Sequence, residues 1–311
     1  MKPIVTLTLN PTIDGSATAE KIVPLHKIRT SDERYHAGGG GINVARVIGE
    51  LGGPSHALYL AGGATGAILE DLLRQTTISA QAIPISGYTR IAHTVFERAS
   101  GQEYRFVPEG PKVSATEWDA CLAALDRLDF DYVVASGTLP RGVPADAYAR
   151  VAEIASRKGA KLILDTSGPA LAATLEKGVF LCKPSLGELE KLVGNALPDD
   201  KARIKAARRL IANGASHVIA ITMGGDGALL VTRDQALRAA APPVLAKSAV
   251  GAGDSFVGAL TLALAQGRSL SEAFVIGVAA GTAAVLCPGG GLCLAEDVAR
   301  LAKTLTAEDV G

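Results

Sequence analysis

A regular alternation of short apolar runs and longer helical patterns constrains the fold of this chain more than any other feature. The runs are rich in β-branched residues, which is typical of buried strands. They are IVTLTL (4–9), HALYL (56–60), YVVAS (132–136), KLILD (161–165), HVIAIT (217–222) and GALLV (227–231). Helices are predicted at 42–51, 64–75, 116–128, 144–157, 198–213, 253–266 and 271–286. This alternation predicts an α/β fold with a largely parallel sheet covered on both faces.

Two stretches, 12–35 and 86–107, do not follow that rhythm. Both are polar, alternating and rich in Thr, Tyr and Arg, and the SG pair at 100–101 indicates a hairpin. We predict that they pair with each other as a small antiparallel sheet projecting from the main body. The chain then divides into this small domain and a large domain made of 1–11, 36–85 and 108–311.

The charge balance limits the partners that this chain attracts. Lys and Arg together number 31, Asp and Glu also number 31, and the formal net charge is +0. Without a net charge, no long-range field draws the chain to nucleic acid or to an anionic membrane, and we predict neither partner. Any anionic ligand must therefore be held by local groups.

The cysteine pattern favours a reducing compartment. No C-x-x-C pair occurs, so neither a zinc site nor a secreted disulfide framework is indicated. We expect a cytoplasmic protein, because the segment MKPIVTLTLNPTID also resembles a strand rather than an export signal. The uncharged run 273–295 is interrupted by five glycines and Pro288, which favours a buried helix followed by a loop over a membrane span. The four cysteines are Cys121, Cys182, Cys287 and Cys293.

The motif GAGDSFVGALTLALAQG, at 251–267, is the strongest chemical signal. Gly251, Ala252 and Gly253 leave backbone N–H groups unobstructed where a helix begins, and helix N-termini favour anions. The helix that follows is apolar on nearly every face and is predicted to be buried. Asp254 lies in its first turn, where a carboxylate either caps the helix or acts beside the anion site.

A second glycine-rich motif, AGGGGINVARVIGELGG, occupies 37–53. Its glycines, which include Gly39 and Gly40, allow the backbone to approach a ligand closely, and Asn43 offers both a donor and an acceptor to a sugar hydroxyl. The alternative is a flexible turn, but four ordered glycines in a row would make such a turn at a high cost in backbone entropy.

Several enzyme classes are excluded by missing motifs. Neither glycine run has the third glycine of G-x-G-x-x-G, which disfavours hydride transfer. The absence of G-x-x-x-x-G-K-[ST], HRD and DFG removes P-loop NTPases and protein kinases. The five histidines show no H-E-x-x-H spacing, and G-x-S-x-G does not occur.

Polar residues recur where the predicted strands end. Asp14, the segment 136–140 that contains Thr138, Asp165 and Lys183 all follow strands, and ligands of open α/β sheets bind at the carboxyl ends of strands. Each residue alone is more often a turn or cap residue, so the repeated placement carries the signal. In the two irregular stretches, arginines and lysines suit either a sugar phosphate or a solvated strand face. These are Lys27, Arg29, Arg90 and Arg105.

Seven segments together resemble, in order and spacing, the PfkB group of ribokinase-like carbohydrate kinases. Within it the chain is most similar to the minor bacterial ATP-dependent 6-phosphofructokinases, and the likeness covers essentially the whole chain. The segments are GGGGINVAR (38–46), AGGATG (61–66), GQEYRFV (101–107), SGTLPRGVP (136–144), DTSGPAL (165–171), KPSLGEL (183–189) and VGAGDSFVGAL (250–260).

The resemblance implies a ribokinase-like, doubly wound domain with a small β lid that closes over the sugar and often forms a dimer clasp. It implies ATP-dependent phosphorylation of the 1-hydroxyl of D-fructose 6-phosphate, with Mg²⁺, in a homodimer. Tagatose 6-phosphate and fructose 1-phosphate remain alternative acceptors. A weakly active sugar-phosphate sensor is an alternative of another class.

The resemblance also implies roles for individual residues. Asp254 matches the general base, and 251–253 match the anion hole for the transferring phosphoryl group. Ser185 and Ala249 depart from the family pattern, which has asparagine and commonly threonine there, so weaker nucleotide or metal binding is expected. The family positions that hold the sugar match Asp14, Gly39, Gly40 and Asn43, and those near the sugar phosphate match Arg90 and Thr138. The positions for the nucleotide and its phosphates match Lys27, Lys183, Ser185, Thr222, Gly224 and Gly227. The position for hydrated Mg²⁺ matches Glu188.

Overall fold

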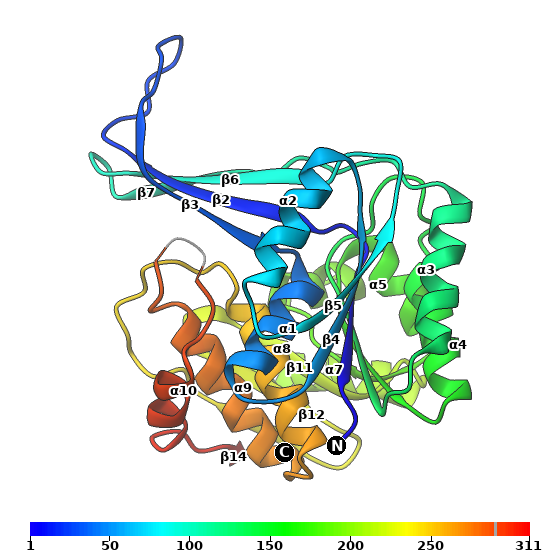
Figure 1. The fold of residues 1–311 in the computed structure, drawn as a ribbon. Coiled ribbons are helices and arrows are strands. Elements are labelled where there is room, and N and C mark those ends of the chain that lie inside the picture. The colour runs from blue at the N-terminus through cyan, green and yellow to red at the C-terminus, as the bar shows by residue number, and fades with distance from the viewer. Residues whose placement is uncertain (289–290) are drawn as a thin grey trace.

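A ten-stranded sheet forms the main body of the computed structural model, which describes residues 1–288 and 291–311 (Figure 1). Its parallel part is β5 (Ser79–Pro84), β4 (Ser55–Ala61), β1 (Ile4–Thr8), β8 (Tyr132–Ser136), β9 (Lys161–Asp165), β10 (Val179–Cys182) and β11 (Ser216–Thr222), in spatial order. Antiparallel β12 (Ala228–Val231), β13 (Ala236–Ala239) and β14 (Glu308–Asp309) continue the sheet beyond β11. The predicted, mostly parallel α/β sheet is confirmed.

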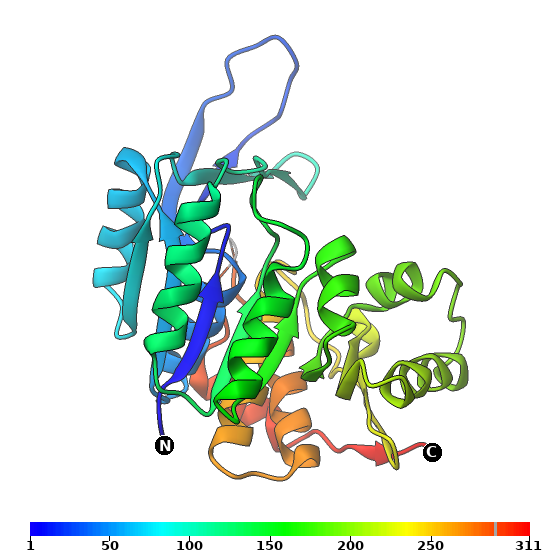
Figure 2. The same ribbon diagram turned by 90° about the vertical axis from the view of Figure 1, so that its right-hand side faces the viewer.

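Helices cover both faces of this sheet, as predicted (Figure 2). Neighbouring residues of β8 show the two layers, because Val133 packs into one core cluster and Val134 into another. One layer holds α1 (Gly40–Glu50), α2 (Gly63–Arg74), α8 (Ala252–Ala265), α9 (Leu270–Ala284) and α10 (Ala295–Ala302). The other holds α3 (Ala115–Arg127), α4 (Ala147–Arg157), α5 (Gly168–Leu175), α6 (Leu186–Val193) and α7 (Asp200–Ala212).

The direction in which the chain winds reverses between β1 and β8. From β1 the chain proceeds to β4 and β5 on one side, and from β8 to β9, β10 and β11 on the other. Connections leaving the carboxyl ends of β1 and β8 therefore diverge, which opens a crevice at a topological switch point. The polar strand ends noted in the sequence all lie along this edge.

A second, four-stranded sheet stands apart from the main one and is called the small sheet below (Figure 1). Its order is β3 (Thr30–Gly38), β2 (Thr12–Ala19), β6 (Arg90–Glu97) and β7 (Gln102–Phe106). The β6–β7 hairpin around the SG turn is confirmed, and β3 extends past residue 35. The loop between β2 and β3 projects furthest from the body.

One detail of the small sheet was predicted incorrectly. The two irregular stretches pair through β2 and β6, and this pairing is parallel rather than antiparallel. The reason is topological: β2 follows β1 and β6 follows β5, and both parent strands end at the same edge of the parallel sheet. Two strands that leave one edge in the same direction can only lie side by side in parallel.

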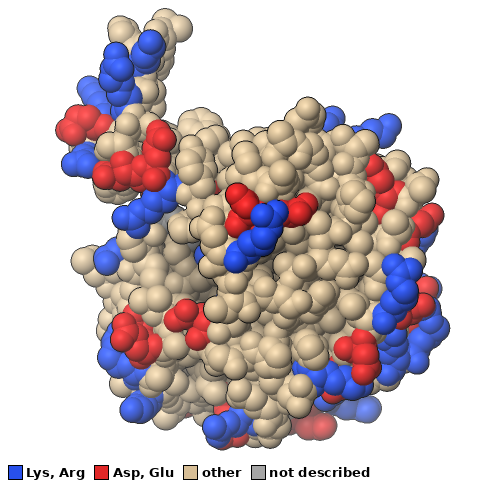
Figure 3. All heavy atoms as spheres, in the orientation of Figure 1, with Lys and Arg blue, Asp and Glu red and all other residues tan. Residues whose placement is uncertain are grey.

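The uncharged run 273–295 begins within α9, which is buried, and its last residue is the first residue of α10. Residues 289 and 290 of that run lie outside the described residues. In the part of the chain that the structure describes, none of the helices combines the length and apolar character that a bilayer span requires. On the face drawn in Figure 3, basic and acidic side chains are interspersed.

Candidate active site

The carboxylate of Asp254 lies at the N-terminal end of α8, in the crevice. Gly251 precedes the helix with a φ of 79°, a left-handed conformation that favours glycine. The rest of α8 is apolar and almost wholly buried, which fixes the helix and therefore its first turn. N–H groups in a first helical turn have no partners within the helix, so 251–253 can receive an anion as predicted.

The two glycine-rich motifs meet at Asp254. Asn43, in the first turn of α1, donates a hydrogen bond from Nδ2 to Asp254 Oδ2 at 2.9 Å, across 211 residues of sequence. Gly251 occupies the N-cap position of α8, and in the part of the chain that the structure describes the Asp254 carboxylate binds the Asn43 amide and no main-chain N–H of α8. The alternative in which Asp254 only caps its helix therefore loses its support.

Burial makes Asp254 easy to protonate. It raises the pKa of the Asp254 carboxyl to about 7, and the charge of Asp165 adds to this effect. The hydrogen bond from Asn43 and the ammonium of Lys183 act in the opposite direction. The result is a carboxyl that changes its protonation state close to neutral pH, which is a property of groups that exchange protons with ligands.

The side chain of Asp14, in β2, lies against Gly38 of the glycine-rich motif, and the charges of three arginines act on it. Burial raises the pKa of the Asp14 carboxyl, although the charges of Arg105, Arg90 and Arg46 all oppose this effect. The charge of Asp14 is also close enough to raise the pKa of Asp254. A carboxylate that accepts hydrogen bonds, set among cations that attract anions, suits a phosphorylated polyol.

Arg90 joins the start of the small sheet to the body. Its Nη2 donates to Asn10 O at 2.9 Å, its Nη1 to Pro108 O at 2.9 Å and its Nε to Pro11 O at 3.4 Å. The Nδ2 of Asn10 in turn donates to Thr138 Oγ1 at 3.3 Å. Arg90 and Thr138, both predicted near a sugar phosphate, therefore lie on either side of Asn10. Two of the five guanidinium N–H groups remain for a ligand.

The first turn of α1 lies against the loop after β8. Gly39 is the N-cap residue of α1, and Gly40 packs directly on Ser136 and Gly137. The structure thus brings the start of α1 next to the segment that carries Thr138, and the sugar-binding roles of Gly39, Gly40 and Asn43 stay predictions.

Lys183 is buried next to the N-terminus of α8. Its Nζ forms an ion pair with Asp165 Oδ1 at 3.0 Å, and the Lys183 side chain is only 6% exposed. Burial alone would lower the pKa of Lys183, but the Asp165 carboxylate outweighs it and the pKa is raised. A Cβ atom added to Gly253 would lie 3.5 Å from Lys183 Nζ, so this cation borders the predicted anion hole.

Ser185 and Glu188 form a capping box at the start of α6. Glu188 N donates to Ser185 Oγ at 3.3 Å, and Ser185 N donates to Glu188 Oε2 at 2.8 Å. The serine that departs from the family pattern is therefore a favourable N-cap residue. In the described residues no hydrogen bond reaches Glu188 Oε1, and the charge of Glu188 acts on Lys183 and Asp165.

A cavity of about 450 Å³ extends from the anion hole between α8, α9 and the end of β11. The lining includes Thr222, Gly224 and Gly227, where the two glycines leave main chain in the cavity wall, and it also includes Ala252 and Gly253. Much of the remaining lining is apolar, which suits a flat aromatic ring. These apolar residues are Pro242, Pro243, Val244, Ala249, Phe256, Val278 and Val285.

The structure does not bring Lys27, which was predicted to contact the nucleotide phosphates, to this crevice. It is exposed in the projecting loop between β2 and β3 (Figure 1). Arg46, by contrast, was missed as a site residue. It donates from Nη1 to Ala37 O at 2.8 Å and acts on Asp14. Its position three residues after Asn43, on the same helical face, was the available signal.

Comparison with known proteins agrees with this geometry. The family described as "pfkB family carbohydrate kinase" matches residues 7–297. The chain belongs to the pfkB family. It is therefore a carbohydrate kinase.

Individual pfkB relatives match nearly end to end. "ATP-dependent 6-phosphofructokinase isozyme 2" of Mycobacterium tuberculosis (strain ATCC 25618 / H37Rv) is 44% identical over 299 residues, covering 96% of this chain and 88% of the relative. "1-phosphofructokinase" of Bacillus subtilis (strain 168) is 34% identical over 281 residues, covering 90% and 91%. These names support a sugar-phosphate kinase.

Two solved structures confirm the ribokinase-like fold. The phosphofructokinase-2 of Escherichia coli in complex with fructose-6-phosphate superposes with a TM-score of 0.92 at 37% identity, covering 98% of this chain and 99% of that one. The ribokinase of Arabidopsis thaliana, with ribose and ATP, has a TM-score of 0.75 at 18% identity, covering 97% and 99%.

Proposed function

We propose that this protein transfers the γ-phosphoryl group of ATP to the 1-hydroxyl of D-fructose 6-phosphate, forming fructose 1,6-bisphosphate and ADP. The observation that carries the proposal is the hydrogen bond between Asn43 and Asp254, at the point where the 450 Å³ cavity meets the N-terminus of α8. A nucleotide in that cavity and a sugar beside Asp14 would meet at this carboxylate.

In the proposed mechanism, Asp254 accepts the proton of the sugar 1-hydroxyl while the oxygen of that hydroxyl attacks the γ-phosphorus in line with the leaving ADP. Asn43 orients the carboxylate, and Asp14 holds neighbouring hydroxyls. The main-chain N–H groups of 251–253 receive the charge that develops on the phosphoryl oxygens. Lys183 neutralises further phosphate charge from its buried position.

The residues present fit a hydrated Mg²⁺. This ion takes one or two carboxylates together with waters and substrate phosphates. Glu188, with Asp165 nearby, supplies such carboxylates. Within the described ranges no cluster of three or more His, Cys, Asp or Glu side chains gathers. When bound, Mg²⁺ would neutralise phosphate charge.

The pH dependence of kcat/KM tests the assignment of Asp254. A base must be unprotonated, so with a pKa of about 7 we expect kcat/KM to fall about tenfold per pH unit below that value. Asn43→Ala removes a hydrogen bond that lowers this pKa, so the midpoint should move upward. Initial rates from about pH 5.5 to about pH 9 measure both. A flat profile down to pH 5.5 in both proteins would exclude Asp254 as the base.

Arg90→Ala tests the sugar-phosphate end of the site. We expect KM for fructose 6-phosphate to rise about 10- to 100-fold with kcat changed little, because a phosphate contact acts in both the ground state and the transition state. Arg141→Ala is the control, since that arginine is exposed and pairs with exposed Glu109. A large loss of kcat with an unchanged KM would contradict this role.

A coupled assay of ADP release decides the substrate. The panel is fructose 6-phosphate, tagatose 6-phosphate, fructose 1-phosphate, fructose and ribose, with and without Mg²⁺. We expect the highest kcat/KM with fructose 6-phosphate. A preference for an unphosphorylated sugar would contradict both the proposed substrate and the role of Arg90, and no turnover with any of them would favour the sensor alternative.

A second candidate is phosphorylation of fructose 1-phosphate. It is favoured by the 1-phosphofructokinase of Bacillus subtilis, which matches 90% of this chain. The two substrates carry their phosphates at opposite ends, so the arginines around Asp14 would bind a different part of the sugar. The same panel separates the two activities.

We also propose that the small sheet closes over the sugar and joins two copies of the chain. Large apolar side chains are exposed on it, including Tyr35 at 49% and Phe106 at 57%, and they line a groove of about 360 Å³. Exposed apolar patches of this kind are typical of protein–protein contacts. Sedimentation velocity should give a homodimer, and a monomer at about 10 μM would contradict this.

A further inference from the structure

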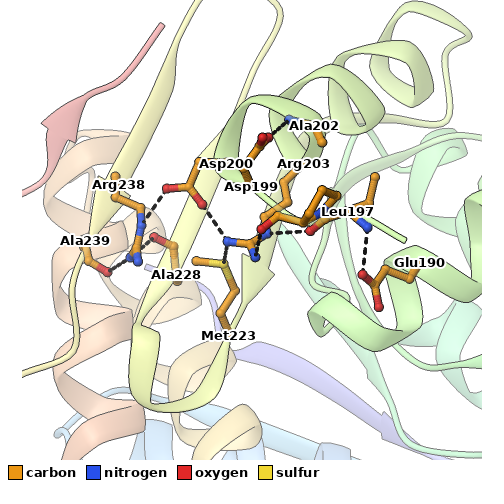
Figure 4. Close-up of polar contacts among 11 residues, drawn as sticks. Glu190, Leu197, Asp199, Asp200, Ala202, Arg203, Met223, Ala228, Arg238 and Ala239 are labelled. Atoms are coloured by element: carbon orange, nitrogen blue, oxygen red, sulfur yellow. Dashed lines mark hydrogen bonds and ion pairs between the residues drawn. The ribbon is translucent and has the colours of Figure 1, made fainter. Parts of the chain in front are cut away.

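A network of charged side chains lies beside the nucleotide cavity, with Asp200 at its centre (Figure 4). Asp200 is the first residue of α7, and its two carboxylate oxygens bind two different arginines. Arg203 Nη1 donates to Oδ1 at 2.7 Å, and Arg238 Nε donates to Oδ2 at 3.0 Å. The arginine side chains are only 16% and 21% exposed, so solvent screens these pairs less than it screens surface pairs.

Besides binding Asp200, both arginines contact residues that flank the turn in the cavity wall (Figure 4). Arg203 Nη1 contacts Met223 Sδ at 3.3 Å. Arg238 Nη1 donates to Ala239 O at 2.9 Å and to Ala228 O at 3.4 Å. Met223 directly precedes the turn Gly224–Asp226, and Ala228 follows it closely.

That turn has almost no side chains with which to fix its own position. It is closed by a hydrogen bond from Met223 N to Gly227 O at 2.8 Å. Gly227, with a φ of 90°, lies directly against Ala239 O, and no Cβ would fit there. The wall is therefore held by the elements around it, and Asp200 joins two of them, α7 and β13.

We propose that Asp200 is a positioning residue for the nucleotide, acting through Arg203 and Arg238 on the main-chain wall of the cavity. The inference rests on the proposed function, which assigns this cavity to ATP. None of the three side chains lines the cavity, so their effect on binding is indirect. Loss of the shared carboxylate would leave two half-buried cations facing each other and would displace the carbonyl groups that they hold.

The preceding residue provides a matched control. Asp199 is the N-cap residue of α7, and its Oδ1 accepts a hydrogen bond from Ala202 N at 2.7 Å. It stabilises the same helix end, but in the described residues its side chain forms no hydrogen bond or ion pair with the two arginines or with the turn. A purely structural role of Asp200 would therefore give the same result as loss of Asp199.

The experiment compares Asp200→Asn with Asp199→Ala in the full chain. We expect Asp200→Asn to weaken ADP binding, measured by calorimetry with ADP and MgCl₂ alone, about 3- to 30-fold. KM for ATP should rise by the same factor, while kcat at saturating ATP and KM for the sugar phosphate stay within about twofold. Asp199→Ala removes the N-cap acceptor, so it should lower Tm without changing either nucleotide constant.

Equal nucleotide affinities in the two variants would overturn the inference. If the wild-type protein binds no ADP, it is the proposed function that fails instead. If Asp200→Asn does not fold, Arg238→Lys serves in its place, because it keeps the charge but loses the guanidinium contacts to Ala228 and Ala239. It should then show the same selective rise in KM for ATP, and an unchanged KM would also overturn the inference.

Discussion

Asp254→Asn is expected to lower kcat by about 10²- to 10⁴-fold, equivalent to about 3–5 kcal/mol of barrier, while KM for the sugar phosphate changes less than about threefold. An amide can still pair with Asn43, but it cannot accept a proton at neutral pH. Steady-state kinetics at saturating ATP measure the effect. Turnover close to that of the wild type would remove Asp254 from the mechanism.

The same substitution is expected to stabilise the fold above pH 7. The pKa of Asp254 is raised from 3.8 to about 7 in the folded state, so folding favours the neutral carboxyl. That stabilisation is complete below pH 4 and is lost as the pH rises through 7. Asn stays neutral, so the free energy of unfolding of the variant should exceed that of the wild type by about 2–4 kcal/mol at pH 8 and should equal it at pH 4.

Urea denaturation at the two pH values measures this gain. A variant that is inactive and also less stable at pH 8 would mean that the substitution damages the fold, and the loss of turnover would then say nothing about a base. Asp14→Asn serves as the comparison, because burial raises the pKa of Asp14 as well. It should weaken sugar binding rather than lower kcat alone.

Lys183→Met is expected to cost about 3–5 kcal/mol of unfolding free energy, because it leaves Asp165 as an unpaired carboxylate in the interior. The ion pair between the two residues is 3.0 Å long, and their side chains are 6% and 15% exposed. The double variant Lys183→Met with Asp165→Leu should recover most of the stability, since an apolar pair replaces the charged one. Turnover should remain low in both variants.

An exposed ion pair of similar length gives the control. Lys177 and Glu153 lie 3.1 Å apart, with side chains 56% and 51% exposed, so Lys177→Met should cost less than about 1 kcal/mol. Denaturant titrations of the three variants compare these values. The prediction is wrong if Lys183→Met lowers the free energy of unfolding no more than Lys177→Met does. It is also wrong if the double variant is no more stable than Lys183→Met.

Much of the fold followed from local pattern. The runs that became β1, β4, β8, β9, β11 and β12 were identified from the sequence because apolar, β-branched segments bounded by turns have few other uses. The antiparallel strands β13 and β14 were not identified. β13 has the sequence ALRA, without a β-branched residue, and β14 is the acidic pair Glu308–Asp309, so neither resembles the apolar runs that marked the other strands.

Local chemistry also made Asp254, Asn43 and Lys183 candidates, because glycines at a helix start and polar residues at strand ends have functional uses wherever the chain folds. Short-range signals of this kind are present in the sequence itself. They identified which residues to consider but not which of them are neighbours.

Only the tertiary structure determined which residues meet. It brought Asn43 to Asp254 across 211 residues and set Arg46 and Arg105 beside Asp14. It also made β2 and β6 parallel and linked Asp200 to the cavity wall. Such contacts depend on strand order and helix packing, which are settled by the burial of the whole core. The pKa of Asp254 depends on that burial as well. The sequence alone therefore determined the kinds of group at the site, whereas their distances and charge states followed from the fold.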